Sequence, residues 1–225
     1  QKGGSHNAKV HFPSKTAAFS ALVFSRCLQG APPCAIALQF IGDPERAIMA
    51  SSVIFFFDWN PQSAVQIPRR LHHTLAVVCL SHGLWTRFNL PRSIVALNTG
   101  PKKPIASALE SLCLPLVLWT FQDIVRGKLI SSFTDNSGFR DAYRGKHRKA
   151  GPLRRNIAAS IIISTRLSCF SNVQLVPTDF NPADKIARGQ PEISLQLCAH
   201  LNLPLSPTPT PPIFPTNHDF WLQEI

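Results

Sequence analysis

The sequence is poor in acidic residues, with only 12 Asp and Glu against 23 Lys and Arg among its 225 residues. The formal net charge is therefore +11, and the sequence pI is about 9.9. A basic balance of this size favours a polyanionic partner such as nucleic acid. Because acids are so scarce, each Asp or Glu in an apolar setting calls for a physical reason.

Several familiar chemical signatures are missing. The sequence has no CxxC pair and no histidine partners at zinc-ligand spacing, which argues against a zinc site. It also lacks a Gly-rich phosphate loop and a GxSxG nucleophile elbow. Adjacent histidines on a strand point to opposite faces, so His72 and His73 make a poor chelate. Since several of the six cysteines lie in apolar runs, we interpret them as reduced core residues of an intracellular protein, cytoplasmic or nuclear. They are Cys27, Cys34, Cys79, Cys113, Cys169 and Cys198.

Long apolar runs are absent as well. None reaches the roughly 18 residues that indicate a membrane-spanning helix, so we predict no membrane segment. The chain begins at Gln1 without a charged-then-apolar signal pattern, and we interpret it as a piece of a longer translation product. The segment Leu203–Pro215 is rich in proline and is predicted to be extended and outside the core.

The composition supports one folded domain with extensions. Hydrophobic residues make up 44% and charged residues 16%, which suits a core for about 150 residues. We predict an N-terminal extension over residues 1–50, which would be the tail of a preceding domain or a linker. The domain itself is predicted over residues 51–190, and a proline-rich tail over residues 191–225.

The strand pattern begins with Val53–Phe57, a continuous apolar run that ends in Asp58. Trp59, Asn60 and Pro61 are predicted to turn the chain after it. Leu84–Phe88 either extends the third strand or follows it. The other strands are predicted at Ala64–Ile67, Thr74–Leu80, Leu129–Thr134 and Asn172–Val176.

Helical spacing first appears over Pro104–Phe121, where Pro115 predicts a kink or an early end. Asn156–Leu167 is helical in spacing, although its three successive isoleucines would also suit a strand. A short helix from Asn181 through Arg188 is predicted to end at Gly189, and another is predicted over Ile193–Leu201. This order predicts an α/β fold with a mixed five-stranded sheet and flanking helices.

Four acids occupy matching places in this order. Asp58 and Asp135 end the first and fourth strands, whereas Glu110 and Asp184 lie in the first helix and in a late one. Four carboxylates at one end of a sheet could not all ionise without cations between them. Two Mg²⁺ ions about 3.5–4 Å apart would offset the charge and clamp the oxygens of a phosphodiester. The alternatives are structural, because an acid can cap a turn, lie in solvent or favour a helix N-terminus.

A basic segment follows Asp135. Between residues 140 and 155 stand seven Lys or Arg against one acid, which either forms a solvated surface or binds phosphates. We interpret it as a nucleic-acid surface. The residues predicted to contact nucleic acid are Asn136, Arg140, Arg144, Lys146, Arg148, Lys149, Arg154 and Arg155.

Three stretches carry a resemblance to a known family. FTDNS, IASALESLCLPLVLW with its single Glu, and VQLVPTDFNPADKIARG together resemble the ribonuclease H domain of retroelement reverse transcriptases. The last stretch is the most specific, because a strand, "VP" and then N-P-A-D resemble how such domains close. The resemblance covers roughly residues 51–189.

The resemblance implies a ribonuclease H-like fold and endonucleolytic hydrolysis of RNA in RNA–DNA hybrids with two Mg²⁺ ions, or Mn²⁺ in their place. It implies that Asp58 bridges both ions, that Glu110 binds the ion near the scissile phosphate, and that Asp135 binds the other and orients the attacking water. Asp184 would complete the set. It also implies a reverse transcriptase domain upstream in the parent polyprotein, and a hybrid held through its A-form backbone.

The chain also departs from the family pattern. WNPQSA follows Asp58 where the family shows small residues and a glycine, and Thr178 or Asp179 stands where a histidine is often found. These departures and Pro115 favour a rival hypothesis, a basic nucleic-acid-binding module that kept the fold but lost catalysis. A third hypothesis is an unselected translation product without a stable fold.

Overall fold

The structure is a computed structural model and describes residues 53–63, 71–99, 106–145 and 151–214. The predicted strand at Ala64–Ile67, the N-terminal extension, and the basic residues Lys146, Arg148 and Lys149 lie outside the described residues. The domain boundaries proposed from the sequence stay a prediction.

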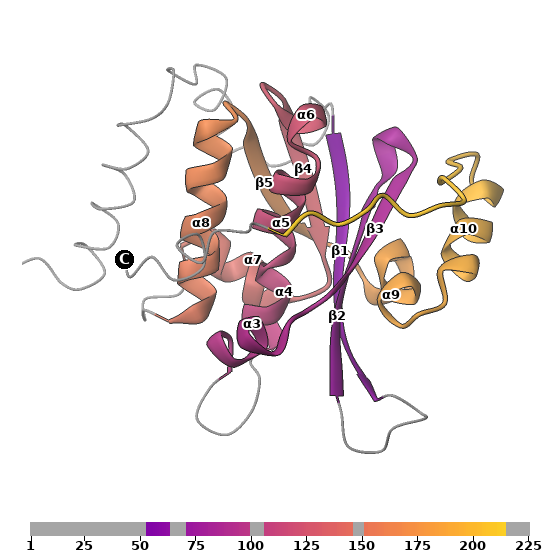
Figure 1. Ribbon diagram of the computed structural model, residues 1–225. Helices are drawn as coiled ribbons and strands as arrows, with labels where there is room; N and C mark the ends of the chain where they lie inside the picture. The colour runs from indigo at the N-terminus through magenta and orange to yellow at the C-terminus, as the bar shows by residue number, and fades with distance from the viewer. Residues whose placement is uncertain (1–52, 64–70, 100–105, 146–150, 215–225) are drawn as a thin grey trace, which may run out of the picture.

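Within the described residues, five strands form one mixed sheet in the order β3-β2-β1-β4-β5 (Figure 1). β1, β2 and β3 pair antiparallel, and β1, β4 and β5 pair parallel. The predicted α/β class, with a mixed five-stranded sheet and flanking helices, is confirmed. The strands are β1 (Val53–Ser63), β2 (Leu71–Cys79), β3 (Leu84–Asn89), β4 (Leu129–Thr134) and β5 (Phe170–Leu175).

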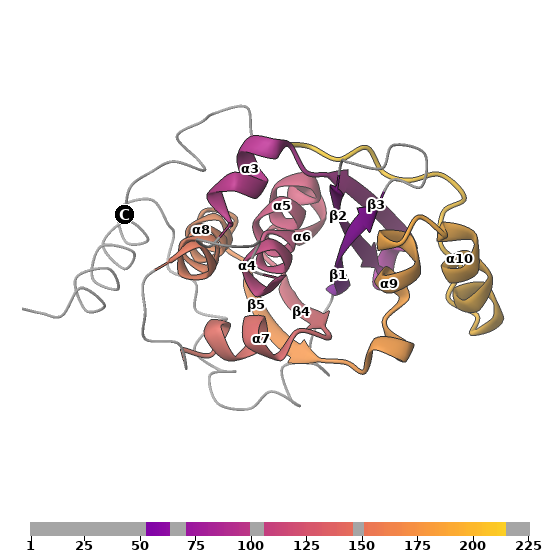
Figure 2. The ribbon, with the colours of Figure 1, turned by 90° about the horizontal axis from the view of Figure 1, so that it is seen from below.

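Helices cover both faces of the sheet (Figure 2). On one face lie α3 (Arg92–Leu97), α4 (Ala106–Ser111), α5 (Cys113–Thr120), α6 (Gln122–Val125) and α8 (Pro152–Arg166), with α7 (Ser137–Tyr143) near β5. On the other face α9 (Pro182–Ala187) packs on β1 and β2, and α10 (Pro191–His200) packs on α9. The short 3-10 turns η2 (Leu80–His82) and η3 (Thr178–Phe180) are among the connections between these elements.

Two hydrophobic clusters fill the two interfaces. The larger lies between the sheet and the α4, α5 and α8 layer and includes Phe55, Phe57, Leu109 and Leu116. The smaller lies under α9 and includes Val78, Trp85 and Ile186. Phe55 and Phe57 thus face one cluster while Phe56 lies against the other, as alternation along a strand requires. A core on both faces fixes the register of β1 and with it the position of Asp58.

The first strand is longer than the sequence predicted. β1 does not turn at Trp59 but stays paired with β2 through Ser63. Its pairing with β4 covers only Val53–Phe56, so Pro61 lies where β1 has no strand on that side. A proline is tolerated in a strand that is open on one side. The expected turn at Trp59–Pro61 is therefore wrong, and Asp58 stands within a strand.

The predicted helix over Pro104–Phe121 is two helices. α4 ends at Ser111, and α5 begins at Cys113 after the single residue Leu112. Pro115 is the third residue of α5, in the first turn, where backbone N–H groups have no intrahelical acceptor. The proline therefore does not disrupt either helix. The break was predicted at Pro115 but lies at Leu112, three residues earlier.

The other predicted elements are confirmed with shifted ends. α8 spans the expected helix, so its three isoleucines are helical. β5 begins two residues before the predicted strand, and α9 ends as expected before Gly189, whose φ is 82°. The cysteines within the described residues, Cys79, Cys113, Cys169 and Cys198, are buried thiols, as the core interpretation requires. Within the described residues no helix is both long and apolar enough to cross a membrane.

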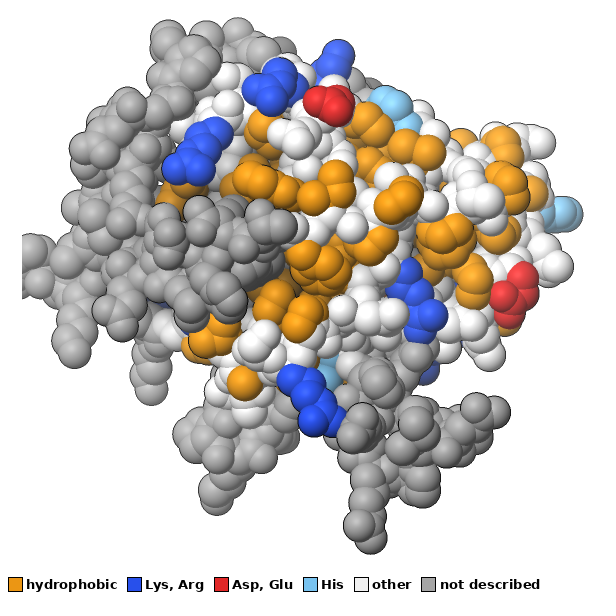
Figure 3. All heavy atoms as spheres, in the orientation of Figure 1, with side chains coloured by type: hydrophobic (Ala, Val, Ile, Leu, Met, Phe, Trp, Pro, Cys, Tyr) orange, Lys and Arg blue, Asp and Glu red, His pale blue; other side chains and the backbone are white. Residues whose placement is uncertain are grey.

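The proline-rich segment does not lie outside the core. It runs extended from α10 along β3 to α5 (Figure 1), and hydrophobic side chains dominate the middle of that face (Figure 3). The amides of Ser206 and Thr210 donate to the carbonyls of Gly83 and Trp85, at 2.6 and 2.7 Å. Leu205 is buried in the cluster under α9. The segment therefore covers the outer edge of β3, where unpaired backbone groups would otherwise be exposed.

Candidate metal centre

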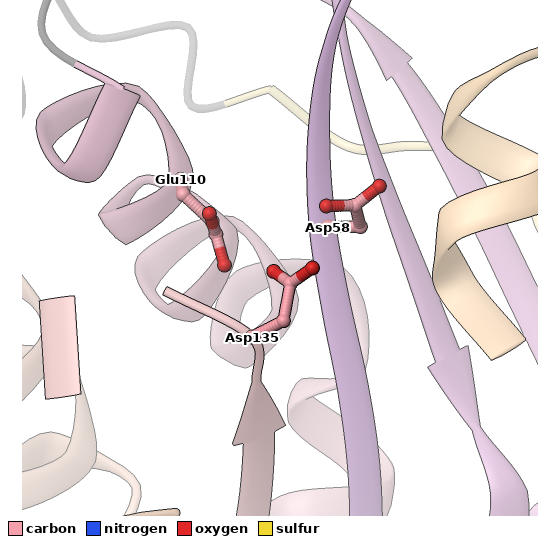
Figure 4. A group of neighbouring side chains, drawn as sticks. All are labelled: Asp58, Glu110 and Asp135. Atoms are coloured by element: carbon pink, nitrogen blue, oxygen red, sulfur yellow. The ribbon is translucent and has the colours of Figure 1, made fainter. Parts of the chain in front are cut away.

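Three carboxylates meet at one end of the sheet. Asp58 comes from β1, Glu110 from α4 and Asp135 from the residue after β4, and their side chains face one another (Figure 4). Each offers an oxygen, and these three oxygens all lie within 4.8 Å of one another. Asp58 and Glu110 are buried, whereas Asp135 is half-buried. Three of the four acids singled out from the sequence are thus brought together.

The sheet itself creates this site. The parallel pairing of β1 with β4 ends at Phe56 and Phe133, and β4 stops after Thr134. Asp58 lies two residues past the end of this pairing, and Asp135 is the first residue after β4. The two carboxylates therefore stand where the sheet opens between two parallel strands, a common place for a ligand site in α/β folds.

Hydrogen bonds hold Glu110 against the end of β4. The hydroxyl of Thr134 donates to Oε1 of Glu110 and accepts from the amide of Asn136, at 3.1 Å for the latter. Asn136 caps α7, since its Oδ1 accepts from the amide of Phe139 at 3.0 Å. The same oxygen accepts from the hydroxyl of Ser107 on α4, at 2.8 Å. The end of β4 and the helix that carries Glu110 are thus fixed together.

A glycine makes this close approach between α4 and α7 feasible. A Cβ built at Gly138 would lie 2.5 Å from Oγ of Ser107, well inside van der Waals contact. Any larger residue at position 138 would therefore have to displace the side chain of Ser107 and disturb its hydrogen bond to Asn136.

Asp135 is held from the other side. The hydroxyl of Thr178 in η3 donates to Oδ2 of Asp135 at 2.7 Å. This links the loop after β5 to the carboxylate at the end of β4. Thr178 is one of the two residues that stand where the family shows a histidine, and in this structure it contacts a carboxylate of the cluster.

The fourth acid stands beside the cluster but is paired differently. Asn181 caps α9 and donates from Nδ2 to the carbonyl of Phe57 at 2.7 Å, which fixes the start of α9 next to Asp58. Asp184 is buried in α9, and its Oδ1 lies 2.6 Å from Nε of Arg188. Its Oδ2 lies 3.1 Å from Nζ of Lys185. Asp184 is not part of the three-oxygen group.

Burial makes ionisation of the cluster costly. It raises the pKa of Asp58 to about 7, with added repulsion from Asp135 and Asp184, while a backbone hydrogen bond and Arg188 act in the opposite direction. Burial also raises the pKa of Glu110 to about 8, against the hydrogen bond from Thr134. Arg188 offsets this only in part, and within the described residues no Lys or Arg forms an ion pair with Asp58 or Glu110. When both carboxyls are ionised, an external cation would therefore stabilise the cluster.

The donor set fits a hard divalent cation. Carboxylate oxygens are the ligands that Mg²⁺, Mn²⁺ and Ca²⁺ prefer, and the group contains neither sulfur nor imidazole. Asp58, Glu110 and Asp135 would hold such an ion. Hydrogen bonds from Thr134 and Thr178 would orient two of these ligands, as outer-sphere groups do in metal sites.

The predicted nucleic-acid residues have varied surroundings. Nε of Arg140 pairs with Asp141 at 2.6 Å, and Nη2 of Arg144 donates to Gln174 on β5 at 2.6 Å. Arg155 is half-buried and donates to the carbonyl of Leu97 at 3.0 Å, which supports the end of α3. Arg154 is also half-buried, and Asn136 serves as the cap described above. Contact of these residues with nucleic acid stays a prediction.

Two residues of the site were not identified as such from the sequence. Arg188 is four residues after Asp184, a spacing that places the two side chains together on a helix and could have indicated the ion pair. The Thr178 hydrogen bond joins elements far apart in the chain, so no local pattern predicts it.

No protein-family model matches the sequence, and no curated protein is significantly similar to it. Two solved structures are similar at 12% identity. One is the N-terminal RNase H domain of rv2228c from Mycobacterium tuberculosis, in a fusion with maltose-binding protein, with a TM-score of 0.42 over 66% of this chain and 99% of that one. The other is RNase H1 from the halophilic archaeon Halobacterium salinarum NRC-1, with a TM-score of 0.44 over 63% and 97%. Likeness at this level does not establish a shared activity.

Proposed function

We propose that this chain is a ribonuclease H-type endonuclease that hydrolyses the RNA strand of RNA–DNA hybrids with two Mg²⁺ ions, or Mn²⁺ in their place. The convergence of Asp58, Glu110 and Asp135, drawn from three elements far apart in the sequence, is the observation that carries it. The sequence motifs around Glu110, Asp135 and Asp184 support the retroelement origin and a reverse transcriptase domain upstream.

The chain's own residues would do three things. Asp58, Glu110 and Asp135 would hold the metal ions, which would supply Lewis-acid activation of the phosphodiester and of the attacking water. Thr134 and Thr178 keep two of the ligands oriented. Lys and Arg side chains at the surface bind the phosphates of the hybrid through charge, because A-form backbones are recognised mainly by shape and phosphate contacts.

A second candidate is a nucleic-acid-binding module without catalysis. One observation favours it: both oxygens of Asp184 contact basic side chains of α9 or its cap, so the fourth acid is already paired with protein cations. This candidate predicts salt-sensitive hybrid binding without cleavage.

One experiment separates the two candidates. The protein is incubated with an end-labelled RNA–DNA hybrid and, separately, with double-stranded DNA and double-stranded RNA, each in Mg²⁺ and in EDTA. The nuclease proposal predicts Mg²⁺-dependent cleavage of RNA in the hybrid alone, and loss of that cleavage in Glu110→Gln. Binding of the hybrid without cleavage in Mg²⁺ or Mn²⁺ would favour the second candidate.

A further inference from the structure

We propose that Arg188 is a built-in cation that holds Asp184 in the ion-free site and must be displaced before Asp184 can help to hold a second metal ion. The two ions would then bind unequally, the first at Asp58, Glu110 and Asp135 and the second more weakly. This inference rests on the proposed function and adds the order in which the site fills.

Both carboxylate oxygens of Asp184 are paired with basic side chains. One is 2.6 Å from Nε of Arg188 and the other is 3.1 Å from Nζ of Lys185. The side chain of Asp184 is only 5% exposed. Water therefore has little access to this carboxylate, and its negative charge is satisfied by protein cations. A carboxylate in this state is a poor ligand until one of the two cations moves away.

Within the described part of the chain, the other three acids differ from Asp184 because they are not held in ion pairs of this kind. The cluster of Asp58, Glu110 and Asp135 has no comparable ion pair among the described residues, and its oxygens already lie within 4.8 Å of one another. It can accept a divalent ion without breaking any ion pair. An ion that needs Asp184 must replace a short, charge-assisted contact first. The two sites should therefore differ in their affinity for a divalent ion.

Arg188 is the stronger competitor of the two cations. Its contact is shorter than that of Lys185, and its charge also acts on Asp58, whose pKa it lowers. Its side chain is 51% exposed, so it can swing into solvent when an ion approaches. Arg188, at the C-terminal end of α9, would therefore lower the affinity for the second metal ion without blocking the site of the first.

The test is a titration with Mn²⁺, followed by electron paramagnetic resonance, on the full chain without nucleic acid. The wild-type protein should show one tighter and one weaker ion. In Arg188→Gln the weaker ion should bind at least about five-fold more tightly, with the first within about two-fold. Arg166→Gln, at the exposed end of α8, removes the same charge far along the chain and should change neither ion. Lys185→Gln should act in the same direction as Arg188→Gln but less.

The outcomes separate this inference from the proposed function. If the second ion binds Arg188→Gln no more tightly than Arg166→Gln, or if Arg188→Gln weakens it, Arg188 is not a competitor and the inference is overturned. If no ion binds the wild-type cluster at all, the proposed function fails as well. Far-ultraviolet circular dichroism on each variant tests whether the fold is kept. Arg188→Lys is a second substitution, which keeps the charge. Arg188→Lys should keep the second ion weak.

Discussion

The hydroxyl of Thr178 lies 2.7 Å from Oδ2 of Asp135 and links the loop that follows β5 to the carboxylate that follows β4. The two residues are 43 positions apart in the chain. Through this contact, η3 and the α9 that follows it keep a fixed place relative to the acidic cluster.

The first prediction concerns this contact. Thr178→Val keeps the shape of the side chain but removes the donor, so Asp135 should lose its fixed orientation. We expect Mn²⁺ affinity at the cluster and hybrid cleavage to fall about 10-fold, as for other groups that orient metal ligands. Thermal melting should change little. Thr99→Val, which removes a hydroxyl that donates to the carbonyl of Val95, is the matched control and should leave Mn²⁺ affinity unchanged. Equal metal affinity in Thr178→Val and wild type would contradict the prediction.

The second prediction concerns pH. The pKa values of Asp58 and Glu110 are raised to about 7 and about 8, above the ordinary values of 3.8 and 4.5. The folded protein therefore binds more protons than the unfolded chain between these limits, and the ion-free free energy of unfolding should fall as pH rises through this window, by a few kcal/mol at most. Urea denaturation in EDTA at pH 5 and pH 8 measures it.

Added Mg²⁺ should restore more stability at pH 8 than at pH 5, because protonated carboxyls do not bind the ion. The double variant Asp58→Asn, Glu110→Gln is the control, since it should lose both the pH slope and the effect of Mg²⁺. A free energy of unfolding that rises from pH 5 to pH 8 in the wild-type ion-free protein would contradict the account.

The third prediction separates stability from function. Asp58→Asn removes a buried charge of nearly unchanged shape, so the ion-free protein should be more stable at pH 8, by about 1–2 kcal/mol. The same substitution should abolish hybrid cleavage. At pH 5, where Asp58 is protonated in the folded state but mostly ionised in the unfolded chain, the stability difference should be smaller than at pH 8, and it should disappear only below the ordinary pKa of 3.8. A destabilised Asp58→Asn at pH 8 would indicate a structural carboxylate instead.

The fourth prediction concerns a buried amide that supports α4. Nδ2 of Asn156 on α8 contacts Oδ1 of Asn98 and the carbonyl of Ala108, each at 2.8 Å, and Oγ of Ser111 at 3.0 Å. Asn156→Ala removes the Nδ2 donor from Oδ1 of Asn98 and from Oγ of Ser111, whereas the carbonyl of Ala108 keeps the hydroxyl of Ser111 as a donor. The substitution should lower the free energy of unfolding by about 2–3 kcal/mol. Chemical denaturation measures it, with Ser160→Ala, in the same helix, expected to cost less because Ser160 bonds only to a backbone carbonyl of its own helix. A loss below that of Ser160→Ala would contradict this role.

The fifth prediction concerns the proline-rich segment. A chain that ends at Asn202 exposes the outer edge of β3 and removes Leu205 from the cluster under α9. It should melt at a lower temperature and self-associate, as exposed edges do. Light scattering after size-exclusion chromatography measures the association. Trp85→Phe removes the 2.8 Å bond from Nε1 to the carbonyl of Ser206 and part of a buried ring, and should lower stability by roughly 1–3 kcal/mol without association. A truncated chain that stays monomeric and equally stable would contradict this account.

Local patterns predicted most elements because they depend on neighbouring residues. The apolar run of β4, the N-P-A-D start of α9 and the spacing of α8 all carry their signal within one element. Wrong predictions came from relations between elements. Trp59–Pro61 looks like a turn, but pairing with β2 extends the strand. The segment 203–214 looks external, but the edge of β3 offers it hydrogen-bond partners.

At the site, too, local patterns were predicted better than contacts between side chains. The contexts of Asp58, Glu110 and Asp135 indicated which acids could meet, because each stands beside a buried strand or within an apolar helix. The pairing of Asp184 with Arg188 was not predicted, although their four-residue spacing could have indicated it. The contact with Lys185 depends on a rotamer, which the order of the elements does not determine.

The central claim is that Asp58, Glu110 and Asp135 form a site for a divalent metal ion. Anomalous X-ray diffraction from crystals soaked in Mn²⁺ tests it most directly. The account predicts an anomalous peak between the three carboxylates, with oxygens of at least two of them about 2–2.5 Å away. Crystals that show no peak there, with the three carboxylates in place and Mn²⁺ bound elsewhere, would contradict it.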